Sequence, residues 1–347
     1  IGTSSSQDQM FIRFSDQENI SDYTPTSTNT AGTFRIDSGT KIVGAVKGKD
    51  YILILTDTSA YVMQFVGPPF TFSIRQVGSN CGCIGQHAIT YANGAVWWMG
   101  QAGGFFVFDG TVKSLPCLVE DFVFTNKGDN LGLSYTNGEQ VYAGLNHLYE
   151  EITWYYPKDG SSLIDRSVTY NYTENTWTTG SLARTTWHDA TLYDNPYATE
   201  FASTGTPTFP TIQGVTDING ATTYYQHEKG NNQVDSAGVK TAIPAFIQSG
   251  DFDLSQGGDG QFFMSVRRFI PDFKLIIGDA QITINLRKFP ADTQSSSPLG
   301  PFTVNSSTEK VDTRARSRFA SIKVANLSTD QNWRYGTFRA DVQPDGM

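Results

Sequence analysis

Carboxylates next to aromatic residues are the side chains of this sequence that come nearest to an acid–base site. Glu150 and Glu151 stand just before Trp154, Tyr155 and Tyr156, and carboxylates beside aromatic platforms are the groups that glycoside hydrolysis uses. Adjacent residues of a strand point to opposite faces, so Glu150 and Glu151 are not expected to act together as a catalytic pair. Glycan cleavage is therefore only an alternative hypothesis for the function of this segment.

A second acidic group lies in the glycine-rich segment DFDLSQGGDG at 251–260. Asp251 and Asp253 share a face if this segment is extended, and Asp259 is close in sequence. Calcium takes six to eight oxygen ligands, so Asp253 and Asp259 alone are too few to hold the ion. We expect a solvated turn here, with neither a metal nor a catalytic role.

The histidines and cysteines show no spacing that is typical of a metal site or of a nucleophile. The four histidines are scattered, at His87, His147, His188 and His227. Cys81 and Cys83 flank one glycine, which is too short for a structural zinc knuckle, and Cys117 makes the number of cysteines odd. No G-x-S-x-G, H-E-x-x-H, Walker or G-x-G-x-x-G motif occurs. We therefore predict buried or idle thiols, no cofactor and no enzymatic activity.

The most informative polar pattern is TRARSRF at 313–319. On a strand, Arg314, Arg316 and Arg318 project from one face, where their like charges need nearby anions. The only acids close in sequence are Glu309 and Asp312. Two interpretations stay open: an edge strand protected against aggregation by its charge, or an interface that docks on an acidic surface of a neighbouring subunit or on DNA phosphate.

Charge is unevenly distributed along the 347 residues, whose net charge is −9. Residues 1–245 hold 13 Lys and Arg against 23 Asp and Glu, whereas residues 246–347 hold 12 against 11. An acidic majority argues against a firm grip on nucleic acid, which requires Lys and Arg to neutralise phosphates. It suits a surface past which DNA moves without sticking, although solubility alone also explains it.

Turn signals predict a chain built of many short hairpins. Val, Ile, Thr, Tyr and Phe dominate between 33 glycines, and this composition favours strands joined by tight turns. Asn-Gly or Asp-Gly pairs, which suit type I′ hairpin turns, stand at 93–94, 109–110, 137–138, 159–160, 219–220 and 259–260. Those at 93–94 and 137–138 lie 44 residues apart, and a period of 40–50 residues is typical of β-propellers.

One segment, SVTYNYTENTWTTG at 167–180, resembles the blade pattern of kelch-type propellers. A strand there ends in aromatic residues, a polar turn follows at 173–175, and a Trp opens the next strand. We expect Tyr170, Tyr172 and Trp177 to pack between blades. Cross-strand aromatic pairs of any hairpin would give a similar pattern.

The pattern changes near residue 245, where strict alternation begins. QITINLR at 281–287 and TFRADV at 337–342 place apolar residues on one face of each strand. We predict an all-β chain with an N-terminal segment at 1–40 that continues from an upstream part, β-propeller-like blades at 41–245, and a β-sandwich or small β-barrel at 246–347. The longest apolar runs, such as YILIL at 51–55, are far shorter than a membrane span, and IGTSSSQDQM does not read as a signal peptide.

Several stretches together resemble the structural tail proteins of short-tailed bacteriophages, of the nozzle or tail-hub type. They are FVGPPFTFSIRQVGSNCGCIG (65–85), VWWMGQAGGFFVFDGTVKSLPC (96–117), ITWYYP (152–157), DRSVTYNYTENTWTTGSLARTTW (165–187), YYQHEKG (224–230), FIQSGDFDL (246–254), RRFIPDF (267–273) and NWRYGTFRAD (332–341). The resemblance covers most of the chain from about residue 40 onward. It carries over no catalytic residue.

This resemblance implies a virion protein whose copies form a ring, expected to be a hexamer, around the DNA exit channel. The expected partners are the other copies, the tail adaptor protein, and tail fibres or spikes. DNA would pass through the channel without specific binding, and the mature virion protein would not insert in a membrane. Two alternatives remain: a receptor-binding, glycan-binding or glycan-cleaving propeller of a phage tail, and a cell-surface propeller used for adhesion.

Overall fold

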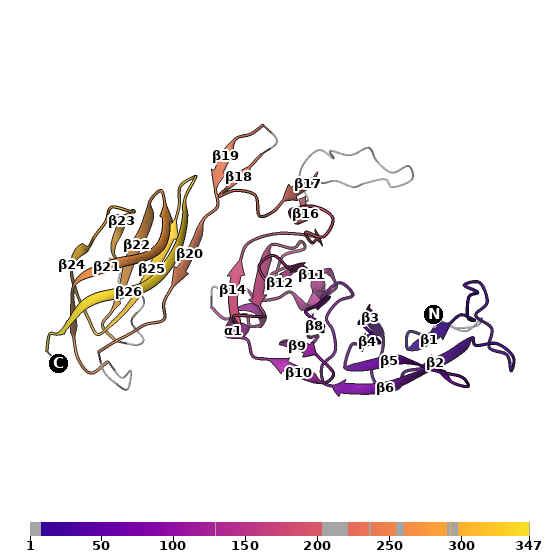
Figure 1. Cartoon of the computed structure of the whole chain (residues 1–347). Coiled ribbons are helices and arrows are strands. Elements are labelled where there is room, and N and C mark those ends of the chain that lie inside the picture. Colours follow the sequence, from indigo (N-terminus) through magenta and orange to yellow (C-terminus); the bar gives the residue numbers. More distant parts are fainter. Residues whose placement is uncertain are drawn as a thin grey trace. The chain divides into compact units, whose positions relative to one another are not determined.

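The chain folds almost entirely into antiparallel β-sheets (Figure 1). The structure, a computed structural model, describes residues 8–128, 130–202, 221–235, 237–254, 260–289, 292 and 298–346. Within these ranges the helices are α1 (Glu120–Phe124) and the 3₁₀ segment η1 (Tyr135–Gln140), so the all-β prediction is confirmed. The chain forms two compact units, Ile1–Glu228 and Lys229–Met347. This division falls before the boundary at 245 that the sequence pattern suggested.

Besides a two-stranded sheet at its N-terminus, the described part of the first unit contains four sheets that follow one another along the chain, each with its strands in sequence order. The first three are four-stranded and the fourth is three-stranded among the described residues. The first sheet comprises β3 (Ile42–Lys47), β4 (Ile52–Thr56), β5 (Ser59–Gly67) and β6 (Thr71–Ser79). The second comprises β7 (Ile89–Ala92), β8 (Ala95–Met99), β9 (Phe105–Phe108) and β10 (Val112–Leu115). The third comprises β11 (Tyr142–Asn146), β12 (Glu151–Tyr156), β13 (Arg166–Asn171) and β14 (Thr176–Gly180), and the fourth β15 (Thr186–His188), β16 (Tyr197–Ala202) and β17 (Ala221–Gln226).

The first strands of these sheets lie next to one another. β3 contacts β7, β7 contacts β11, and β11 contacts β15. Up-and-down sheets that meet through their first strands have the arrangement of propeller blades, whose inner strands surround the axis. The predicted propeller-like blades are therefore present, and we refer to the four sheets as blades one to four.

Aromatic residues fill the space between blades two and three. The ring of Phe105 on β9 lies 4.7 Å from that of Trp154 on β12 and 4.7 Å from that of Trp177 on β14. Trp97 on β8 lies 5.8 Å from Tyr170 and stacks on Tyr172 at 6.2 Å. The packing between blades that the sequence predicted for Tyr170, Tyr172 and Trp177 is confirmed.

The two-residue hairpin turn that the sequence predicted is confirmed at 93–94. Asn93 and Gly94 join β7 to β8 with φ of 50° and 78°, the left-handed conformation that a type I′ turn requires. The pairs at 109–110 and 159–160 also connect paired strands, but they lie in loops of three residues (109–111) and nine residues (157–165), so the two-residue type I′ turn expected there is wrong. The hairpin predicted at 137–138 is wrong, because these residues belong to η1, where Gly138 packs closely against Ile84. The pair at 219–220 and Asp259 of the pair at 259–260 lie outside the described residues.

The N-terminal segment packs onto blade one. β1 (Phe11–Phe14) pairs with β2 (Gly32–Arg35), and the buried residues Met10 and Ile36 flank this pair. Both side chains share an apolar cluster with Ile54, Tyr61 and Met63 of blade one. The segment therefore contributes to the core of the first unit.

The second unit contains two sheets and a small hairpin. The hairpin is β18 (Asn232–Val234) with β19 (Lys240–Ala242). One sheet has the order β20 (Ala245–Gln248), β25 (Phe319–Asn326), β22 (Ala280–Arg287), β23 (Leu299–Val304), and the other β24 (Val311–Ser317), β21 (Met264–Ile277), β26 (Asn332–Pro344). Both sheets contribute to one apolar cluster, for example through Phe269 and Ile284. This is the predicted β-sandwich, and the alternation expected at 281–287 is confirmed by burial of Ile282 and Ile284.

The core between blades can be tested with two Phe→Ala variants. Phe105 is completely buried, whereas Phe70 in the turn before β6 is 76% exposed. We expect Phe105→Ala to lower the free energy of unfolding by about 3–5 kcal/mol, because it leaves a cavity beside Trp154 and Trp177. Phe70→Ala should change the free energy by less than about 0.5 kcal/mol. Urea titrations followed by Trp fluorescence measure both, and equal losses would contradict the assignment of Phe105 to the core.

Candidate functional site

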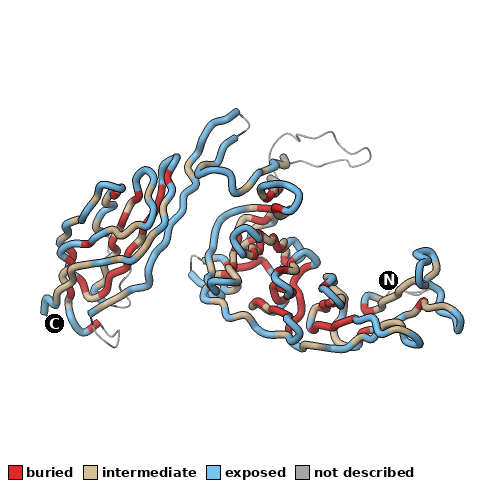
Figure 2. The backbone as a smooth tube through the Cα atoms, viewed as in Figure 1, coloured by how far each residue is buried: buried red, intermediate tan, exposed pale blue. Residues whose placement is uncertain are grey.

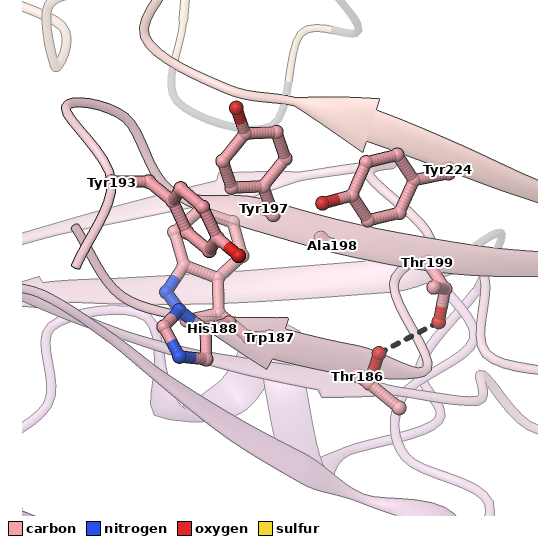
Figure 3. Close-up of a pocket in the computed structure, with 8 residues that line it drawn as sticks. All are labelled: Thr186, Trp187, His188, Tyr193, Tyr197, Ala198, Thr199 and Tyr224. Carbon is pink, nitrogen blue, oxygen red and sulfur yellow. Dashed lines mark hydrogen bonds between the residues drawn. The ribbon is translucent and has the colours of Figure 1, made fainter. Parts of the chain in front are cut away.

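A concave surface lined by aromatic residues lies on blade four (Figure 3). A pocket of about 310 Å³ opens there, and we call it the tyrosine pocket. It is lined by Thr186, Trp187, His188, Tyr193, Tyr197, Ala198, Thr199 and Tyr224. Figure 3 shows Tyr193, Tyr197 and Tyr224 standing around this space, whereas Ala198, which the register opposes to Trp187, alternates with Tyr197 and Thr199 along β16.

The period of two in these strands brings most of the pocket residues to one face, whereas Trp187 and Ala198 occupy the alternate positions. The register opposes Thr186 to Thr199 and His188 to Tyr197, so these side chains project together with Tyr224 of β17. The Thr186 and Thr199 hydroxyls lie 2.7 Å apart (Figure 3).

The tyrosine rings are ordered against one another and remain accessible. Tyr197 and Tyr224 stack with centroids 5.2 Å apart and planes 12° apart, and Tyr193 meets the edge of Tyr197 at 5.2 Å. Tyr193 is 53% exposed and Tyr224 is 61% exposed. Desolvation by neighbouring atoms raises the pKa of Tyr224, so its hydroxyl stays neutral, able to donate and to accept.

The opposite face of blade four is fixed by a buried arginine. Arg184 donates from Nη1 to Glu200 Oε2 and from Nε to His227 Nε2, each at 2.9 Å. Its guanidinium also lies 3.9 Å from the centre of the Tyr225 ring. Burial, helped by the charge of Arg184, lowers the pKa of His227 to about 4. His227 is therefore a neutral acceptor for Arg184 at neutral pH.

Trp187 connects the pocket to blade three. Its ring stacks on Tyr155 at 6.0 Å, and its Nε1 donates to the Leu145 carbonyl at 2.7 Å. Gly144 permits this approach, since a Cβ at that position would lie 2.7 Å from Trp187 Cγ. The floor of the pocket is thus held by the neighbouring blade.

The glutamates that suggested sugar chemistry do not meet in the structure. Glu150 sits exposed in a left-handed turn with φ of 61°, whereas Glu151 is partly buried on β12. Burial raises the pKa of Glu151, and the nearby charge of Glu228 raises it further. Burial also raises the pKa of Glu228, which accepts a hydrogen bond from Asn146. Sequence reasoning missed Glu228 because only the contact between blades three and four brings it near Glu151.

The acids at 251–260 and the thiols have structural roles. Asp251 pairs with Arg287 at 3.2 Å, and Asp253 Oδ2 accepts the Gly260 N–H at 2.6 Å. Asp259 lies outside the described residues, and in the described part of the chain no cluster of three His, Cys, Asp or Glu is placed to hold a metal ion. The thiols are free, and desolvation raises the pKa of Cys81 and Cys117 to about 11 and of Cys83 to about 12. The prediction of buried thiols is confirmed for Cys81 and Cys83, and Cys117 is partly buried.

The arginine stripe, Arg314, Arg316 and Arg318, lies on and just after β24. Arg314 and Arg316 are exposed and alternate with the buried Ala315 and Ser317, as the sequence predicted. Arg316 Nε donates to Asp345 Oδ2 at 2.6 Å. The anion that Arg316 needs is therefore supplied within the chain, by an acid at the end of β26 that is distant in sequence.

Arg318 is likewise satisfied within the chain. It donates to the Gly260 and Gln261 carbonyls at 2.9 and 3.0 Å. The ring of Phe263 lies 4.6 Å from its guanidinium and 4.3 Å from that of Arg316. Among the described residues, Arg314 alone of the three makes neither an ion pair nor a hydrogen bond through its side chain. Whether the stripe is an interface stays a prediction.

No helix within the described ranges is long and apolar enough to cross a bilayer.

Comparisons with known proteins leave the family open. No family model matches, and no curated protein matches. Among solved structures, a glycoside hydrolase has 10% identity and a TM-score of 0.26, with 86% of this chain and 83% of that chain covered. The N-terminal domain of Nup159 has 11% identity and a TM-score of 0.27 over 89% and 80% of the two chains. A chain from the S. cerevisiae complex of Dbp5 with Nup159 and Gle1 has 9% identity and a TM-score of 0.26 over 84% and 77%. Similarities this low do not bear on function.

The neutral state of His227 predicts a dependence of stability on pH. A proton binds His227 near pH 6.5 in the unfolded chain but only near pH 4 in the folded chain, so the stability it contributes falls as pH decreases through this window. His227→Gln should remove this part of the decrease. The raised pKa values of Glu151 and Glu228 have the opposite effect on stability as pH falls. Both glutamates are present in the unmodified chain and in the variant, so their effect cancels in the comparison.

The measurement is the free energy of unfolding of both proteins from pH 4 to pH 7. His188→Gln, which changes an exposed histidine of the same blade, serves as the control and should behave as the unmodified chain does. Parallel curves for the unmodified chain and His227→Gln would contradict the buried neutral imidazole.

Proposed function

We propose that the chain is a structural subunit of the tail of a short-tailed bacteriophage, where copies form a nozzle or hub ring around the DNA exit channel. The eight sequence stretches that resemble such proteins support this proposal. The expected ring is a hexamer that joins the tail adaptor and the fibres or spikes, and DNA passes through it without specific binding. The role is mechanical and needs no catalytic group.

The observation that carries the proposal is the exposed edge strand β20 (Figure 2). All four of its residues are exposed, including Phe246 at 63% and Ile247 at 52%. It pairs with β25 on one side and ends the sheet order on the other. An apolar edge strand tends to pair with another chain unless charge, proline or a covering segment prevents it. This supports β20 as a contact between subunits, and its last three residues belong to a stretch that carries the resemblance, FIQSGDFDL at 246–254.

The distribution of charge between the units also supports assembly. Residues 1–228 hold 11 Lys and Arg against 22 Asp and Glu, whereas residues 229–347 hold 14 against 12. Surfaces of opposite charge on two copies of one chain favour their association in a defined register. In the second unit, Arg314 is exposed on β24. We assign its guanidinium to a contact with acidic side chains of a neighbouring subunit.

A lysine on the edge strand tests the assembly contact. Ile247→Lys should raise the concentration needed for assembly at least about tenfold, because a charge on an edge strand opposes pairing with another strand. Ile20→Lys, at a position 84% exposed in the first unit, is the control and should assemble normally. Size-exclusion chromatography with light scattering measures the assembly, and incorporation into tails measures its biological counterpart. Equal assembly of both variants would contradict a subunit contact at β20.

Reversing one charge tests the arginine stripe without disturbing the fold. Arg314→Glu removes no described ion pair, so the variant should keep the thermal stability of the unmodified chain. If Arg314 meets an acidic neighbour, assembly should weaken, and the difference should shrink as salt screens the charges. Arg334→Glu, at an exposed position on β26 of the same sheet, is the control. Normal assembly and DNA ejection by Arg314→Glu would leave the stripe as protection of β24 against aggregation.

A further inference from the structure

We propose that the tyrosine pocket of blade four binds a neutral hexose ring of a polysaccharide. This is a recognition site separate from the assembly role proposed above. It is argued from the aromatic lining, the free hydroxyl groups, the absence of charged lining residues and the size of the pocket (Figure 3).

The aromatic lining offers apolar faces to a flat ligand. A pyranose ring has an apolar face of C–H groups, which packs on aromatic rings, and hydroxyls around its edge. Tyr193 and Tyr224 keep more than half of their surface exposed, and Tyr197 holds Tyr224 in place by stacking. Rigid amphipathic rings of this kind supply contact area at a low cost in conformational entropy.

The polar groups of the pocket suit hydroxyl ligands. The hydroxyls of Tyr193, Tyr197 and Tyr224 make no hydrogen bond to the described residues, so each is able to donate to a ligand and to accept from it. Thr186 and Thr199 add a pair of hydroxyls 2.7 Å apart. A few placed polar groups within an aromatic lining are typical of small-molecule sites.

The charge of the site selects a neutral ligand. Among the residues that the structure describes, no Asp, Glu, Lys or Arg lines the pocket. The first unit, to which it belongs, holds twice as many acidic as basic residues, 22 against 11. Nucleobases also stack on tyrosine, but their phosphates would meet this acidic field without a cation to neutralise them. Uronic and sialic acids are disfavoured for the same reason.

The size and the rigidity of the pocket agree with one or two sugar rings. Its volume of about 310 Å³ is near the lower limit of about 300 Å³ for small-molecule sites. The hydrogen bonds of Trp187 and Arg184 hold the floor before any ligand arrives, and a site formed in advance loses less entropy on binding. Blades two and three pack aromatic residues against each other. A sheet of another subunit could pack on the tyrosines in the same way, and it is the alternative occupant of this face.

The experiment is titration of the full chain with neutral disaccharides, namely maltose, cellobiose, lactose and mannobiose. Saturation-transfer NMR detects contact, and calorimetry gives the affinity. Digalacturonic acid is the anionic comparison. We expect at least one neutral disaccharide to bind with a millimolar or lower Kd, and digalacturonic acid to bind at least tenfold more weakly.

Two variants locate the binding. Tyr193→Ala and Tyr224→Ala should each weaken binding about tenfold or more, with unchanged thermal unfolding because both side chains are exposed. Tyr149→Ala is the matched control, since Tyr149 is also 53% exposed and lies outside the pocket. The absence of binding by every neutral disaccharide, or unchanged binding in both pocket variants, would overturn the proposal. So would loss of oligomers in these variants without sugar binding, which would assign the face to a subunit contact.

Discussion

Contact between aromatic rings of successive blades is the interaction on which the first unit depends. Phe105 of blade two packs against both Trp154 and Trp177 of blade three, whose rings stack on each other. Trp154 also donates from Nε1 to the Ala88 carbonyl at 3.1 Å, so a buried indole satisfies its polar group while it joins two blades. A sheet of four short strands cannot bury its own two faces, so each blade is stable only against its neighbour.

The need of each blade for a neighbour also explains why one face of blade four is buried and the other is accessible. Its inner face meets blade three through Trp187 and is completed by the buried Arg184. Its outer face carries the accessible rings of Tyr193 and Tyr224. In the second unit β20 has a similar position, since it ends a sheet with exposed Phe246 and Ile247. In both places a sheet has partners on one side only. We assign the tyrosine face of blade four to a sugar and the β20 edge to a neighbouring subunit.

Sequence reasoning predicted the features that depend on local chemistry. The hairpin turn at 93–94, the aromatic residues of 167–180 and the alternation at 281–287 all follow from turn conformation or from the period of two. It failed at 137–138, where Gly138 is needed for close packing instead of a turn. It also missed the Asp345 partner of Arg316 and the meeting of Glu151 with Glu228, because pairing of distant strands leaves no mark in the local sequence. The tyrosine pocket was missed for the same reason, since its residues come from three strands and a loop.

Electron microscopy of the purified full chain tests most directly whether its copies assemble into a ring. The account predicts closed rings of uniform diameter with a central channel, with β20 at the contact between subunits. Class averages that show only single subunits, at concentrations up to those reached in a virion, would contradict the account. Cleavage of host polysaccharide by those single subunits would further favour the alternative of a glycan-cleaving tail protein.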